Sequence, residues 1–192
     1  MGRAPMSEPP ATAVERRHYL GPWRIDVTVR PGVPVPTSAA SLARAAAAAL
    51  DVIGAPRPAS LGLILSNDRE LAALNAEHMA ETGPTDVLSF PLLPPEAFAR
   101  RVWTRTSPGA EFKLPPGRRI HLGDIVISVQ RATAQARAGR GGQTGDVRWP
   151  ASDELRLLVT HGVLHVCGWD HATPKEEAAM RTLEERLLKA GQ

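Results

Sequence analysis

The chain has 192 residues, enough for one domain with a substantial core, and 43% of them are hydrophobic. No apolar run is long enough to span a bilayer, and residues 1–21 lack the apolar segment of a secretory signal. Cys167 is the single cysteine and cannot build a disulfide framework, and the net charge of +3 permits a polyanionic partner without requiring one. These features predict a cytoplasmic protein that does not act on a membrane.

Residues 1–20 are rich in Pro, Ala and charge and show no apolar periodicity, which predicts a flexible tail before one domain at 21–192. Short apolar or alternating runs predict four strands, at 24–29, 61–65, 87–90 and 125–129. About five helices are expected, beginning near residues 38, 67, 131, 152 and 173 and ending near 54, 83, 138, 168 and 191. The helix near 152 has Ser152 as its expected N-cap.

Strands interleaved with helices predict an α/β (α+β) domain around a small mixed four-stranded sheet. Residues 92–119 read as a long loop with several Pro, Gly and Arg residues. This basic insertion is either a flap that faces a polyanion or an ordinary solvated loop.

Half of the six histidines lie in one stretch, HGVLHVCGWDH, at residues 161–171. On a helix His161 and His165 lie one turn apart on one face, and Gly168 is suited to end the helix so that His171 can fold back toward them. Three neutral imidazoles leave a fourth position for water or substrate, as in a catalytic zinc site. Histidines with no shared ligand and a purely structural zinc are the alternatives, and Cys167 is expected to point away from the site, about 200° round the helix from His165.

The histidine spacing matches that of metzincin proteases, which carry a glutamate directly after the first histidine as general base. Gly162 occupies that position and cannot take a proton. Peptide hydrolysis is therefore disfavoured, whereas attack by metal-bound hydroxide or a substrate hydroxyl stays open.

The same stretch resembles the H-G-x-L-H-L-x-G-Y-D-H motif of the YbeY family of bacterial endoribonucleases, and residues 74–91 and 122–128 resemble two further motifs of that family. The resemblance implies one α/β domain in which His161, His165 and His171 hold one Zn²⁺. It also implies metal-dependent cleavage of single-stranded RNA, a role at the 3′ end of small-subunit rRNA and in ribosome quality control, and the small ribosomal subunit as partner, with no DNA expected.

The resemblance places Thr85 and Asp86 on the family's Thr-Asp pair and Asp124 on the acid of its third motif. The catalytic candidates are His161, Asp86 and Asp170. Asp86 is expected to orient a histidine ligand or the water, with an ordinary turn or cap carboxylate as the alternative. Asp170 is expected to act similarly, with a local loop hydrogen bond as the alternative.

One departure from the family pattern is His78-Met79, where relatives commonly carry Tyr-Arg. Met79 cannot contact phosphate, so either an arginine at 100, 101, 118 or 119 substitutes or nuclease activity is weaker. A non-catalytic, zinc-stabilised ribosome assembly factor is therefore the second hypothesis, and a metallohydrolase of another substrate class, including a peptidase, is the third.

Overall fold

The computed structural model describes residues 12–98, 118–139, 149–169 and 173–190. Its centre is a mixed sheet in the order β1-β2-β3-β5-β4. The strands are β1 (Val14–Leu20), β2 (Trp23–Val29), β3 (Ala59–Ser66), β4 (Val87–Pro91) and β5 (Ile120–Ser128). Strands β2, β3 and β5 are parallel, and the two edge strands β1 and β4 are antiparallel to their neighbours.

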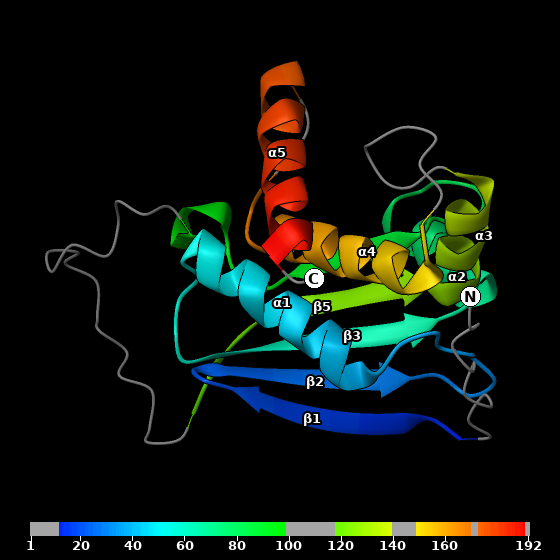
Figure 1. Ribbon diagram of the computed structural model, residues 1–192, viewed down its shortest axis with the longest axis horizontal. Coiled ribbons are helices and arrows are strands. Elements are labelled where there is room, and N and C mark those ends of the chain that lie inside the picture. Colours follow the sequence, from blue (N-terminus) through cyan, green and yellow to red (C-terminus); the bar gives the residue numbers. More distant parts are fainter. Residues whose placement is uncertain (1–11, 99–117, 140–148, 170–172, 191–192) are drawn as a thin grey trace, which may run out of the picture.

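The helices divide between the two faces of this sheet. They are α1 (Ala39–Ile53), α2 (Asp68–His78), α3 (Val129–Ala138), α4 (Ala151–Val166) and α5 (Pro174–Ala190), with a 3₁₀ turn η1 at Pro95–Phe98. Figure 1 shows α1 and α4 crossing the same face of the sheet and α5 rising away from it. Among the described residues no helix is both long and apolar enough to cross a membrane.

The predicted fold class is confirmed, with five strands in the sheet where four were expected. The additional strand is β1, in residues assigned to the tail. Its central residues, 15–18, are charged or polar, and none of its residues is fully buried, so the sequence carries no alternating apolar pattern there. The strand is recognised by its antiparallel pairing with β2. An ion pair between Arg17 of β1 and Asp26 of β2, at 3.0 Å, links the two strands.

Several element boundaries also differ from the prediction, and three of them illustrate the reasons. Helix α2 ends at His78 rather than near Gly83, because Ala80 takes a left-handed conformation with φ of 56°. Strand β5 begins at Ile120, five residues earlier than expected. Helix α4 has Pro150 at its N-cap with no side-chain cap, so Ser152 lies inside the helix. Each difference lies at an element end, where sequence signals are weakest.

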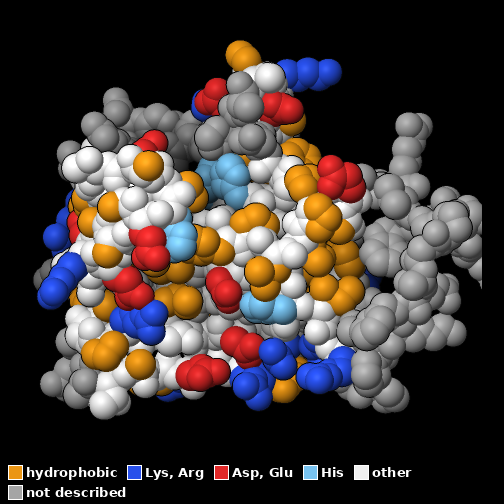
Figure 2. Space-filling view, turned by 180° about the vertical axis from the view of Figure 1, so that it is seen from behind, with side chains coloured by type: hydrophobic (Ala, Val, Ile, Leu, Met, Phe, Trp, Pro, Cys, Tyr) orange, Lys and Arg blue, Asp and Glu red, His pale blue; other side chains and the backbone are white. Residues whose placement is uncertain are grey.

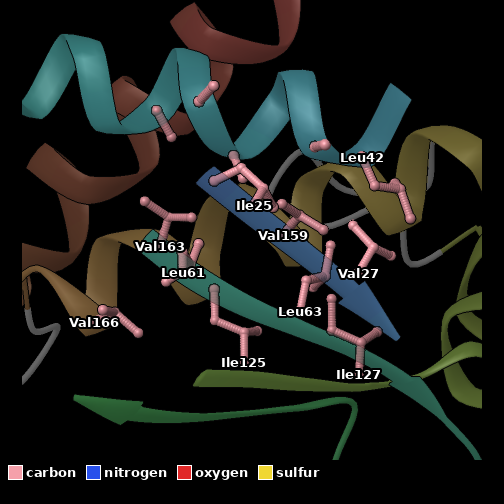
Figure 3. Close-up of a cluster of buried hydrophobic side chains, with 14 of the residues drawn as sticks. Ile25, Val27, Leu42, Leu61, Leu63, Ile125, Ile127, Val159, Val163 and Val166 are labelled. Carbon is pink, nitrogen blue, oxygen red and sulfur yellow. The ribbon is translucent and has the colours of Figure 1, made fainter. Parts of the chain in front are cut away.

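The main core lies between the sheet and the layer of α1 and α4. Figure 3 shows alternate side chains of the parallel strands pointing toward the helices, where they meet Leu42 of α1 and a row of valines on α4. That row is Val159, Val163 and Val166, at helical spacing. The packing fixes the rotation of α4 about its axis and so determines which of its side chains point away from the core.

A smaller core lies on the other face of the sheet. Leu71 of α2 packs there with Leu88 of β4 and Val126 of β5. Because side chains alternate along a strand, Val126 points away from α4 while its neighbours Ile125 and Ile127 point toward it. Figure 2 shows acidic and basic side chains next to one another in the lower part of the view from behind, with hydrophobic side chains above them.

Candidate metal centre in a cleft beside strand β4

Helix α4 ends in the manner predicted from Gly168. The N–H of Gly168 donates to the carbonyl of His165, and the N–H of Trp169 donates to that of Leu164, both at 3.0 Å. This pair of bonds is a Schellman motif, and Gly168 supplies its left-handed residue with φ of 80°. A Cβ at position 168 would lie 2.8 Å from Pro95, so the turn also packs tightly against η1.

His161 and His165 face each other on the last two turns of α4. Their Nε2 atoms are 3.0 Å apart, and their rings meet edge to face with centroids 4.5 Å apart. One helical turn separates the two residues, as the sequence predicted. The side chain of His161 is 18% exposed, so the pair lies partly sheltered at the protein surface.

A carboxylate of the last helix contacts this pair. Oε1 of Glu184 lies 2.8 Å from Nδ1 of His161, and Glu184 is 1% exposed. Glu184 was not among the residues predicted for the site. A signal was nevertheless present, because Glu184 falls between Met180 and Leu187 on the apolar stripe of α5, where a charged residue is unusual.

The histidine pair opens into a cleft of about 560 Å³ between α4 and the edge strand β4. Met79, Ser89 and Trp169 are among its lining residues, together with Asp86. The Ser89 hydroxyl donates to the carbonyl of Gly162 at 3.2 Å and ties the strand to the helix beside the histidines. None of the described lining residues is Lys or Arg, so neither Arg118 nor Arg119 supplies a cation to the cleft in place of Met79. Arg100 and Arg101, the other two predicted candidates, lie outside the described residues.

Asp86 reaches the cleft at the start of β4, but its described hydrogen bonds go elsewhere. Oδ1 accepts from the N–H of Val87 at 2.8 Å and from the hydroxyl of Thr85 at 3.2 Å. Oδ2 accepts from Nε2 of Gln135 in α3 at 2.9 Å. The carboxylate therefore anchors β4 to α3, and its expected role toward a ligand or the reacting water stays a prediction.

Asp124, which the resemblance singled out, lies on the other face of the sheet. Its Oδ1 is 3.3 Å from Nε2 of His121 and fills the space where a Cβ at Gly62 would be. Because Ile125 points toward α4, its neighbour Asp124 points away. The structure therefore separates Asp124 from the histidine pair.

The remaining predicted site residues, Asp170 and His171, lie outside the described residues. Cys167 is 2% exposed and belongs to the main core, as expected for a residue pointing away from the histidines. Burial raises the pKa of its thiol to about 12, which keeps the thiol protonated at neutral pH. A protonated, buried thiol is not suited to bind a metal.

The two described histidines fit a metal ion. Their Nε2 atoms are closer together than twice a Zn–N bond of about 2.0–2.1 Å, so one ion can bond to both. The carboxylate on Nδ1 of His161 is the usual partner of a metal-bound histidine. Without residues 170–172 the described part of the chain holds no cluster of three or more metal-binding side chains.

Comparison with known proteins identifies the family. A model of the family Endoribonuclease YbeY matches residues 33–192. The chain belongs to the YbeY family. An Endoribonuclease YbeY of Thermobifida fusca is 39% identical over 168 residues, which cover 85% of this chain and 91% of the relative. The YbeY of Salinispora tropica is 37% identical over 85% of this chain and 93% of its own length.

The fold has a counterpart among solved structures. A solution structure of a Thermotoga maritima protein superposes with a TM-score of 0.51 and covers 87% of this chain and 88% of that one. The two sequences are 19% identical, so this likeness concerns the fold alone. It supports the fold described above for this member of the family.

Proposed function

We propose that this protein is a zinc-dependent endoribonuclease that cleaves single-stranded RNA. Its expected task is maturation of the 3′ end of small-subunit rRNA and ribosome quality control in the cytoplasm, with the small ribosomal subunit as partner. The observation that carries the proposal is the convergence of the His161 and His165 Nε2 atoms, 3.0 Å apart, in an open cleft. Membership of an endoribonuclease family supports RNA as the substrate.

His161, His165 and His171 would hold the ion. A bound Zn²⁺ supplies Lewis-acid stabilisation of a phosphodiester and a water of lowered pKa. The residues of the chain have other tasks. Helix α4 presents two imidazoles on one face, and the hydroxyl of Ser89 holds that helix against the wall of the cleft.

The side chains that line the cleft favour single-stranded RNA over a duplex. Its wall includes Trp169 and Met79, apolar side chains on which an unpaired base can pack, whereas paired bases are not available for such contacts. Within the proposal Asp86 and Asp170 remain the predicted participants near the scissile phosphate. The position of Asp86 in the lining of the cleft supports its part in the proposal, and Asp170 lies outside the described residues.

A non-catalytic assembly factor is the second candidate, and one observation favours it. Met79 lines the cleft where an arginine is common in the family, and none of the described lining residues is Lys or Arg. Such a cleft has less electrostatic attraction for a phosphate backbone. The structure disfavours the peptidase hypothesis. A protease of the metzincin kind needs a glutamate at position 162, and a side chain there would collide with Ile125.

Cleavage of a labelled single-stranded fragment of small-subunit rRNA by the zinc-loaded protein tests the proposal. His161→Ala and His165→Ala are expected to abolish cleavage and lower zinc content. His121→Ala is the matched control, since a register shift in β5 puts His121 on the other face of the sheet, where it contacts Ser60 and Asp124. Full zinc retention by His165→Ala would contradict the ligand set. The assembly-factor hypothesis would be favoured if the folded, zinc-loaded wild type cleaves neither naked RNA nor ribosomal subunits.

A further inference from the structure

Glu184 is a charged side chain in a core position. It is 1% exposed and lies one turn after Met180 and one before Leu187, which are both buried. Helix α5, which rises from the α4 layer in Figure 1, thus presents a carboxylate on the stripe that otherwise packs as core. Taking a carboxylate out of water is costly unless several partners replace its hydration.

The described partners of this carboxylate do not balance that cost. Oε1 contacts Nδ1 of His161 at 2.8 Å, and this is the ion pair that the structure shows for Glu184. Oε2 is buried and has no hydrogen-bond partner among the described residues. A buried polar group satisfied on one side only is a feature that a purely structural residue would not need.

The contact has a definite chemical effect on His161. A carboxylate that accepts from Nδ1–H leaves Nε2 as the nitrogen without a proton, with its lone pair available. That Nε2 is the atom that meets Nε2 of His165 in the cleft. The hydrogen bond also holds the imidazole ring in one orientation.

From this geometry we infer that Glu184 is the positioning residue of the metal centre, acting through His161. The sequence predicted Asp86 for such a role, but the carboxylate of Asp86 is bonded to Val87, Thr85 and Gln135. The inference rests on the proposed metal site and adds a requirement to it. Docking of α5 against α4 becomes part of building the site, although His161 and Glu184 are 23 residues apart in sequence.

Two substitutions separate positioning from packing. Glu184→Leu removes the carboxylate and fills a similar volume with apolar atoms, whereas Glu184→Gln keeps the shape and an acceptor oxygen but removes the charge. Met180→Ala is the control for packing on the same stripe. Glu177→Gln is the control for charge, since Glu177 forms an exposed ion pair with Arg181 on the same helix.

The readouts are the zinc dissociation constant, measured by competition with a chromophoric chelator, and the melting temperature of the zinc-free protein. Loss of a carboxylate behind a histidine ligand typically weakens metal binding by about 10–100-fold. We expect about 10-fold for Glu184→Gln and about 100-fold for Glu184→Leu. The melting temperature of zinc-free Glu184→Leu should equal or exceed that of the wild type, because a buried charge with a single partner has been removed.

Both control variants should keep the zinc affinity of the wild type. Met180→Ala is expected to lower the melting temperature with zinc affinity within about twofold of the wild type, and Glu177→Gln to change neither. A lowered melting temperature of Glu184→Leu with unchanged zinc affinity would overturn the inference. If Glu184→Leu does not fold, Glu184→Gln decides, and wild-type affinity in that variant overturns it as well.

The same measurements keep the inference distinct from the proposed function. If the wild type does not bind zinc in a manner that depends on His161 and His165, the proposed function fails. If the wild type binds zinc and both Glu184 variants bind it equally well, only the role of Glu184 fails.

Discussion

A Cβ placed on Gly162 would lie 2.6 Å from Cγ2 of Ile125, so α4 approaches β5 at van der Waals contact beside the first histidine. This contact explains why glycine follows His161. The position where a metzincin protease carries its catalytic glutamate faces the sheet in this fold. It leaves no room for a side chain.

Gly162→Ala should therefore destabilise the protein, although alanine is the better helix former. The helix-propensity gain is about 1 kcal/mol, and overpacking typically costs about 1–3 kcal/mol. Urea unfolding measures the net loss, and Gly162→Glu is expected to lose more, with no gain in peptide hydrolysis. In an Ile125→Ala background, where the blocking side chain is gone, Gly162→Ala should be neutral or stabilising; an equal penalty in both backgrounds would show that the contact is not the cause.

Met79→Arg should strengthen RNA binding in the cleft. Met79 is 47% exposed and lines the cleft, so a guanidinium there can reach a phosphate. One added phosphate contact steepens the dependence of log affinity on log salt by about 0.7 for a single strand. Filter binding at several salt concentrations measures both the affinity for RNA and this slope. Val52→Arg is the matched control, with the same added charge at a site on α1 that is 46% exposed, and an equal gain there would indicate non-specific attraction.

Asp86→Asn should separate the two roles considered for this residue. Gln135 has a buried Oε1 without a hydrogen-bond partner among the described residues, so its amide can turn and accept from the new asparagine. The anchor between β4 and α3 is then kept and the melting temperature should change little. If the carboxylate acts on a ligand or the water, as the sequence predicted, cleavage falls by about 10–100-fold at unchanged melting temperature. Unchanged cleavage would leave anchoring as its role.

Cys167 should make stability fall at alkaline pH. Burial raises the pKa of its thiol from 9.0 to about 12, so the folded protein holds a proton that the unfolded chain releases earlier. The stabilisation is complete below pH 9 and is lost as the pH rises toward 12. Cys167→Ala should remove this part of the pH dependence and leave zinc content unchanged. Alkylation of Cys167 at pH 8 should be slow in the native state and fast in urea. Loss of zinc from the Cys167→Ala variant would contradict the orientation assigned to this side chain.

The sequence by itself determined the features that depend on neighbours along the chain. The one-turn spacing of His161 and His165 places both on one helix face, and Gly168 ends that helix, because a helix and its C-terminal turn are set by residues within a few positions. Apolar runs likewise predicted the central strands, and the alternation of strands with helices predicted the fold class.

Only the tertiary structure decided which distant residues meet. Strand β1 has no apolar pattern and exists through its pairing with β2. Asp124 is separated from the histidines by the alternation of side chains on β5, and Asp86 is bonded to Gln135 of a later helix. Glu184 reaches His161 because α5 docks on α4. Such contacts depend on how elements pack, and no local pattern encodes which carboxylate a histidine will contact.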